Sequence, residues 1–183
     1  MNTLTKFIDF NLQLHNHSGE QNEGEINRGS KGSRYEVIES ETLLNSDLNE
    51  LQISGSLFSL TTFKNVTFQS CVFYASKIEN CQFVNCKFID CSFQFTEMNY
   101  CHLKGTVFVN CKWDLSPCKN NQLDFCGLDN KTSFFLSKYS NEMNACHKID
   151  ETKWQREREE EMAAQVEESG VGFLLSQFKK LAA

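Results

Sequence analysis

A large apolar residue recurs at every fifth position in the middle of this chain, and a small residue stands two places before each one. The large column is Phe58, Phe63, Phe68, Phe73, Ile78, Phe83, Phe88, Phe93, Met98, Leu103, Phe108 and Trp113. The small column is Ser56, Thr61, Val66, Cys71, Ser76, Cys81, Cys86, Cys91, Thr96, Cys101, Thr106 and Cys111. A period of five fits neither the helical period of about 3.6 residues nor the strand period of about two. Both columns therefore face inward, and the chain turns a corner every five residues.

The same phase extends beyond this clean stretch in both directions. The further residues in phase are Ile38, Leu43, Leu48 and Ile53 before it, and Cys118, Leu123 and Leu128 after it. The phase is lost at Ser133. Because Cys118 is smaller than the other central residues, we expect the last coil to fray there. We place the repeat array at residues 35–132.

Three consecutive repeats, which begin at Cys81, Cys86 and Cys91, resemble the pentapeptide-repeat family. A repeat of that family has a central Leu or Phe and a small residue two places before it. The resemblance implies an all-β solenoid, namely a right-handed quadrilateral β-helix with four repeats in each coil. The array would then make about four to five coils, and residues about twenty apart would stack at the strand spacing of about 4.8 Å.

This stacking predicts a structural ladder of aromatic and cysteine side chains inside the solenoid. Its members are Phe58, Phe63, Phe68, Phe73, Phe83, Phe88, Phe93, Phe108, Trp113, Cys71, Cys81, Cys86, Cys91, Cys101 and Cys111. We interpret the thiols as small hydrophobes, because a zinc site needs about four converging ligands and these fall on different sides of a coil. No metal or other cofactor is predicted. Cys146 lies outside the ladder and is predicted to be the most reactive thiol.

The rest of the chain divides by composition. Residues 1–14 are predicted to form an N-terminal strand or cap, and the polar residues 15–34 a flexible linker. Residues 133–149 are predicted to be a connector, and residues 150–183 a segment of two helices that begins at an Asp150 N-cap. The second helix has one apolar face, which either caps the last coil or contacts a partner. That face holds Leu174, Leu175 and Phe178.

Charge and hydropathy narrow the class of protein. The net charge of −6 does not favour binding to the phosphates of a nucleic acid. No apolar run approaches the roughly 20 residues that cross a bilayer, and the N-terminus does not resemble a secretory signal. We therefore predict a cytoplasmic protein with reduced thiols, no membrane contact and no direct binding to nucleic acid.

The polar residues do not predict an enzyme. His102 and His147 have no Cys or Asp partner at a recognisable spacing, so a catalytic triad is unsupported. Asp124 and Asp129 are interpreted as surface charges. The sequence has no Gly-rich phosphate loop.

Two groups of apolar residues are predicted to point outward. One group is Ile89, Val107 and Val109, and the other is a corner column of Ala75, Phe95 and Leu115. Exposed apolar stripes mark places where something binds. The chain's own terminal segments could cover them, or a partner protein or a second copy of the chain could. With the Leu174, Leu175 and Phe178 face, they form the predicted interaction surface.

Two functions follow from this interpretation. The first is a non-catalytic protein–protein interaction scaffold whose partner is an unidentified protein or a second copy. The alternative comes from the resemblance, because one branch of the family mimics duplex DNA and protects DNA gyrase. Between Ile38 and Asn130 ten acidic residues face six lysines, a net charge of −4. Duplex DNA carries about one charge per 1.7 Å, so this rod is a sparse mimic and the scaffold is favoured.

Overall fold

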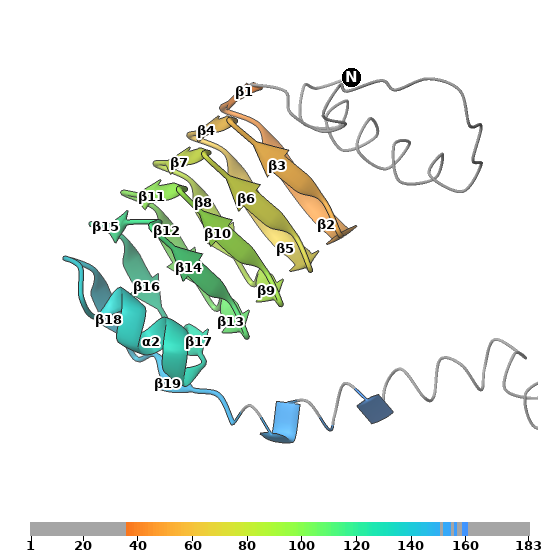
Figure 1. Ribbon diagram of the computed structural model, residues 1–183. Helices are drawn as coiled ribbons and strands as arrows, with labels where there is room; N and C mark the ends of the chain where they lie inside the picture. The colour runs from red at the N-terminus through yellow and green to blue at the C-terminus, as the bar shows by residue number, and fades with distance from the viewer. Residues whose placement is uncertain (1–35, 151, 155, 157–158, 161–183) are drawn as a thin grey trace, which may run out of the picture. The chain divides into compact units, whose positions relative to one another are not determined.

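The computed structural model describes residues 36–150, 152–154, 156 and 159–160 (Figure 1). The chain divides into two compact units, Met1–Lys148 and Ile149–Ala183. The described part of the first unit is a parallel β-solenoid with four faces. The predicted right-handed quadrilateral β-helix is confirmed, with about six turns instead of four to five.

The strands form one parallel column on each face. Face 1 consists of β1 (Val37–Glu39), β4 (Leu57–Ser59), β7 (Lys77–Glu79), β11 (Glu97–Asn99) and β15 (Cys118–Lys119). Faces 2 and 3 share the long strands β2 (Thr42–Asn49) and β5 (Thr62–Gln69). Face 2 continues with β8 (Gln82–Val84), β12 (His102–Lys104), β16 (Gln122–Asp124) and β18 (Glu142–Asn144). Face 3 continues with β9 (Lys87–Ile89), β13 (Val107–Val109), β17 (Gly127–Leu128) and β19 (His147–Lys148). Face 4 consists of β3 (Gln52–Ser54), β6 (Val72–Tyr74), β10 (Ser92–Gln94) and β14 (Lys112–Asp114).

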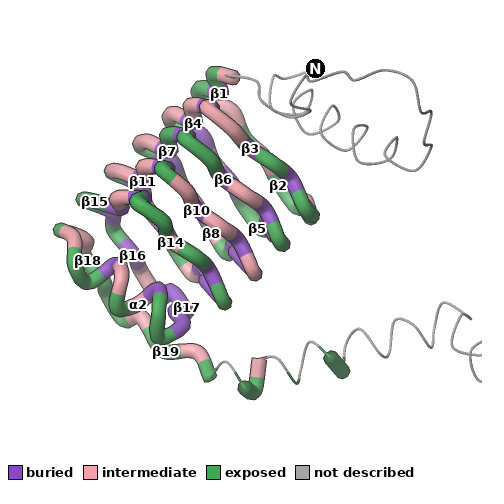
Figure 2. Tube along the Cα trace, viewed as in Figure 1, coloured by how far each residue is buried: buried purple, intermediate pink, exposed green. Residues whose placement is uncertain are grey.

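The register places residues twenty apart beside one another, so the large apolar residues stack inside the solenoid. Phe73 pairs with Phe93, and Phe93 pairs with Trp113. Ring centroids in these columns are 4.7 Å apart for Phe68 and Phe88 and 4.2 Å apart for Phe93 and Trp113. The rings are almost parallel because the backbone holds them at the strand spacing. Most strands from β1 to β17 therefore have a buried residue at the central position (Figure 2).

The small column does more than fill tight space. The Cys71 Sγ atom lies 3.2 Å from the carbonyl oxygen of Leu48, and the Thr96 hydroxyl donates to the carbonyl of Phe73 at 2.9 Å. Each acceptor is the central residue of the previous turn. Ser, Thr and Cys share a small size and a donor, which gives a buried carbonyl a further hydrogen bond. The mixture of these three residue types follows from that shared chemistry.

The corners of the repeat from Ser40 to Phe125, and the one at Ala145, use a left-handed backbone conformation. Residues two places after a central residue have φ near +50°, for example 52° at Asn85 and 60° at Gly105. Gly, Asn and Asp adopt this conformation most readily. The corner N–H of Asn85 donates to the carbonyl of Lys104 on the next turn, at 2.8 Å. Backbone preference therefore accounts for the corners that carry Gly, Asn or Asp.

The solenoid does not end near residue 130, so the predicted connector over 133–149 needs correction. Helix α2 (Asn130–Leu136) occupies the place of the next face-4 strand, after which β18 and β19 resume the array. Met143 pairs with Leu123 and Lys148 pairs with Leu128, again twenty residues apart. The helix and the turn that follows it together use the same number of residues as the repeats they replace, so the register survives. Cys118 is buried and pairs with Met98, so the expected fraying there is wrong.

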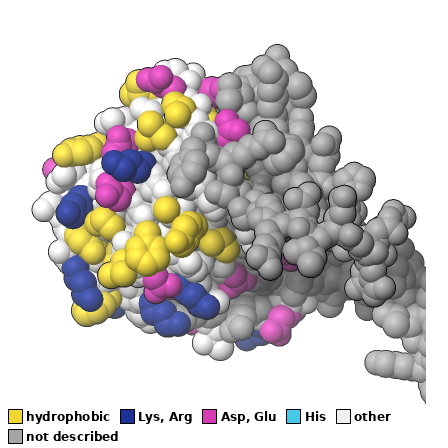
Figure 3. Space-filling model, turned by 45° about the horizontal axis from the view of Figure 1, so that its top comes forward, with side chains coloured by type: hydrophobic (Ala, Val, Ile, Leu, Met, Phe, Trp, Pro, Cys, Tyr) yellow, Lys and Arg dark blue, Asp and Glu magenta, His cyan; other side chains and the backbone are white. Residues whose placement is uncertain are grey.

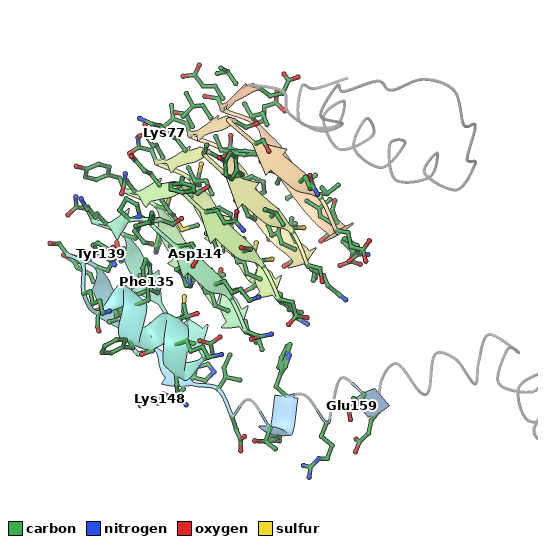
Figure 4. The ribbon with its side chains drawn as sticks, viewed as in Figure 1. Lys77, Asp114, Phe135, Tyr139, Lys148 and Glu159 are labelled. Carbon is green, nitrogen blue, oxygen red and sulfur yellow. The ribbon has the colours of Figure 1, made fainter. Side chains whose placement is uncertain are left out.

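Helix α2 forms because its ends and its inner side are satisfied. The Asp129 Oδ1 atom accepts the backbone N–H of Thr132 at 2.6 Å, which caps the helix. Asp129 is fully buried, so its interpretation as a surface charge is wrong. Leu136 is buried against the core and Phe135 packs beside it. Figure 4 shows Phe135 and Tyr139 at this end of the solenoid.

In the second unit, Asp150 begins a helix as the sequence predicts. Its side chain accepts the N–H groups of Thr152 and Lys153 at 3.0 and 3.2 Å. In the part of the chain that the structure describes, no helix has the length and apolar character needed to cross a membrane. The predictions for residues 1–34 and for the face of Leu174, Leu175 and Phe178 lie outside the described residues.

Candidate interaction surface

Five large apolar side chains project into solvent from left-handed corner positions. They are Leu60, Phe95, Tyr100, Leu115 and Phe125. Their φ angles lie between 48° and 56°, a region that is unfavourable for residues with bulky side chains. Between 53% and 77% of each residue is exposed. Neither backbone preference nor burial accounts for these residues, which is the pattern expected of a functional surface.

The corner between faces 4 and 1 carries the most continuous apolar group. Its column, which we call the 4–1 corner, consists of Gly55, Ala75, Phe95 and Leu115. The ring of Tyr74 meets the ring of Phe95 edge to face, with centroids 5.8 Å apart. Figure 3 shows hydrophobic side chains gathered in a band across this side of the molecule. Phe95 and Leu115, both predicted as interaction residues, are thus exposed and adjacent in one column.

The second predicted stripe is not exposed. Ile89 and Val109 point away from the core on β9 and β13, yet only 7% and 5% of these residues is accessible. Val107 is half-buried. Strand alternation shows that a side chain points away from the core, but it does not show whether solvent reaches it. The prediction that Ile89 and Val109 offer a free surface is therefore wrong.

Charges of both signs flank the 4–1 corner. Lys77 on β7 is exposed (Figure 4). Its register partner Glu97 on β11 is half-buried. Lys112 and Asp114 lie on β14 and are both exposed. A surface that alternates charge around an apolar centre suits a specific protein contact.

His102 has a partner that its sequence spacing hides. Its Nε2 atom lies 2.7 Å from Asp124 Oδ2 on the next turn of face 2. Asp124 also accepts the side-chain amides of Asn144 at 3.0 Å and Gln122 at 2.9 Å. The Asn144 amide, and then His102, lower the pKa of the Asp124 carboxyl. These contacts connect strands β12, β16 and β18 on three successive turns. The His102–Asp124 pair therefore has a structural role.

The structure places every predicted ladder cysteine in the core. Burial raises the pKa of the Cys86 thiol to about 11 and the pKa values of Cys118 and Cys126 to about 12. Such thiols are largely protonated and poorly reactive at neutral pH. Among the described residues no cluster of three or more His, Cys, Asp or Glu could hold a metal ion.

Cys146 belongs to the ladder, which corrects its predicted position outside it. Its Sγ atom lies 3.4 Å from the carbonyl oxygen of Leu123, the same contact that Cys126 makes with Leu103 at 3.3 Å. Cys146 is half-buried because it lies on the last turn. The sequence signal for this assignment was available, since Cys146 follows Cys126 by twenty residues.

Comparisons with known proteins show weak likenesses only. No protein-family model matches the sequence, and no curated protein matches it. Among solved structures, a trypsin-treated variant of QnrB1, a plasmid-mediated fluoroquinolone resistance protein, is 10% identical. That alignment covers 66% of this chain and 94% of the other, with a TM-score of 0.19. Full-length QnrB1 is 13% identical over 67% of this chain and 89% of the other, with a TM-score of 0.14. Such low scores carry no inference about function.

Proposed function

We propose that this protein is a non-catalytic protein–protein interaction scaffold. The observation that supports this most is the set of large apolar side chains at corner positions. A left-handed backbone and exposure to water each disfavour Leu60, Phe95, Tyr100, Leu115 and Phe125, so their occurrence at five corners points to contacts with another molecule. The polar features that first suggest chemistry, the thiols and the His102–Asp124 pair, have structural explanations.

The solenoid suits this function because its corners are rigid. Each turn is tied to its neighbours by backbone hydrogen bonds, so a corner side chain loses little backbone freedom when a partner binds. Aromatic side chains on a fixed backbone are typical centres of binding energy at protein interfaces. The nine free thiols fit a reducing compartment, and we include a cytoplasmic location in the proposal.

Site-specific photo-crosslinking tests the proposal. A benzophenone amino acid in place of Tyr100, at an exposed corner, is expected to crosslink a partner protein in the native host. The same group in place of Gln82, on the exposed polar side of face 2, is the matched control. The captured partner, once purified, is expected to bind Tyr100→Asp or Leu60→Asp at least about tenfold more weakly than the original protein. Unchanged affinity in both variants would contradict the proposal.

The alternative function is protection of DNA gyrase by DNA mimicry. It is less favoured, because the exposed lysines Lys64, Lys77, Lys104 and Lys112 interrupt the acidic side chains of the rod. A supercoiling assay with and without a quinolone separates the two. Inhibition of gyrase or protection from the quinolone at micromolar protein would favour the alternative over the scaffold.

A further inference from the structure

We propose that the 4–1 corner is a homodimer interface in which two copies pack antiparallel, with Phe95 of one copy against Ala75 of the other. This inference rests on the proposed function and names the occupant of one of its surfaces. Two observations support it. Small and large side chains lie at opposite ends of the corner, and residues of opposite charge lie beside it.

Two small residues occupy one end of the corner and two large residues the other. The column reads Gly55, Ala75, Phe95 and Leu115, and its members lie on successive turns about 4.8 Å apart. A twofold axis midway between Ala75 and Phe95 places each Phe95 over the alanine of the second copy. The same axis places each Leu115 over Gly55 of the second copy. Large side chains then fill the spaces that small ones leave, as a self-complementary interface requires.

The parallel arrangement lacks this fit. It would place Phe95 against Phe95 and Leu115 against Leu115 of the second copy. These contacts would hold the two copies apart at Gly55 and Ala75 and leave a gap there. The antiparallel arrangement is therefore the one that the column favours.

The charges next to the corner agree with the antiparallel arrangement. The outward row of face 1 beside the corner reads Leu57, Lys77, Glu97 and Pro117. The same twofold axis brings Lys77 of each copy opposite Glu97 of the other. It also brings Leu57 opposite Pro117, so apolar residues meet at both ends of the row. Opposite charges in register favour this partner and this orientation over others.

The outward row of face 4 on the other side of the corner is also compatible. It reads Ser54, Tyr74, Gln94 and Asp114. Antiparallel packing sets Tyr74 opposite Gln94 and Ser54 opposite Asp114. Both are pairs of a donor and an acceptor, so the row can form hydrogen bonds across the interface.

The contact is small, so the dimer is expected to be weak. Three rows over four turns contribute twelve residues from each copy, whereas a standard interface uses roughly 20–30 residues on each side. We expect a dissociation constant on the order of 10 μM.

Charge reversal combined with mixing tests this arrangement. Sedimentation equilibrium of the full chain, from roughly 1 to 200 μM, is expected to show a monomer–dimer equilibrium with this dissociation constant. Lys77→Glu and Glu97→Lys are each expected to weaken dimerisation at least about tenfold, because each places like charges opposite one another twice. An equal mixture of the two variants is expected to dimerise again, since both cross-pairs are then of opposite charge.

The mixing experiment distinguishes loss of the interface from misfolding of the variants. Lys77 and Glu97 are also neighbours within one chain, and mixing does not restore that intrachain pair. Lys64→Glu, on exposed face 2, is the matched control and is expected to leave the equilibrium unchanged. A wild-type chain that stays monomeric at about 200 μM, or a mixture that stays monomeric while the wild type dimerises, would overturn the proposal. Crosslinking at Tyr100 reports on the scaffold function independently, so the two can fail separately.

Discussion

The indole ring of Trp113 lies flat against the ring of Phe135, with centroids 5.0 Å apart and planes 14° from parallel. On its other side Trp113 stacks on Phe93, with centroids 4.2 Å apart. Its Nε1 group donates to the hydroxyl of Thr132 at 3.3 Å. The aromatic column of face 4 therefore continues into helix α2, which covers the end of that column.

Removing the Phe135 ring is expected to destabilise this end of the solenoid. Phe135→Ala exposes Trp113 and should lower the free energy of unfolding by about 2–3 kcal/mol, since the ring is only partly buried. Urea unfolding measures the loss. Phe134→Ala is the matched control, because that ring is exposed beside Lys138, and it should cost less than about 1 kcal/mol. Equal losses in the two variants would contradict the stacking role.

An alanine in place of Gly105 is expected to destabilise the solenoid. A Cβ atom at this position would lie 2.6 Å from Asn85 Oδ1, and φ is +60°. Gly105→Ala should cost about 2 kcal/mol, part from the contact and part from the left-handed backbone. The double variant Gly105→Ala with Asn85→Ala removes the contact. Its loss of stability should be smaller than the sum of the losses in the two single variants. Thermal unfolding of the three variants measures this coupling, and strict additivity would argue against it.

The Thr96 hydroxyl is expected to matter more than the Thr96 methyl group. The hydroxyl donates to the Phe73 carbonyl and accepts the backbone N–H of Ser76 at 3.3 Å. Thr96→Val keeps the shape but removes both of these hydrogen bonds, so it should cost about 2–3 kcal/mol. Thr96→Ser keeps the hydroxyl and should cost about 1 kcal/mol or less. Chemical denaturation ranks the two, and a larger loss in the serine variant would refute the donor role.

Stability is expected to fall in alkaline solution because of the buried thiols. Burial raises the pKa values of Cys118 and Cys126 to about 12, whereas an unfolded thiol ionises near 8.5. Below about pH 8.5 both states are protonated and this stabilisation is fully present. Above it the unfolded chain loses protons that the folded chain keeps, so stability falls by up to about 1.4 kcal/mol per pH unit for each thiol.

Urea unfolding between about pH 7.5 and 10 measures this slope. Cys126→Ser retains a donor at that position and should make the slope shallower by the contribution of one thiol. An identical slope in this variant would show that Cys126 does not carry the effect.

Labelling of the native protein is expected to occur first at Cys146. It is half-buried, whereas the other eight cysteines are buried. A thiol reagent such as Ellman's reagent should therefore give about one rapidly reacting group per chain. Cys146→Ser should remove that rapid phase. Rapid reaction of all nine thiols would contradict the buried ladder.

Several structural features depend on contacts that periodicity does not encode. The His102–Asp124 contact joins residues twenty-two apart on neighbouring turns, so a search for local motifs misses it. Helix α2 interrupts the apolar phase, which hides the return of the repeat at Met143. Phe95 at a corner and Ile89 on a strand are both predicted to point outward, yet only Phe95 is accessible.

The sequence by itself determined the period of five, the inward columns and the twenty-residue register, because each repeat must satisfy the same local packing whichever turn it occupies. Only the tertiary structure decided where the array ends and which outward apolar residues stay exposed. These features depend on which groups meet across neighbouring turns. At the 4–1 corner both levels contribute, since the sequence puts small and large side chains at opposite ends of the column and the fold places that column on the surface.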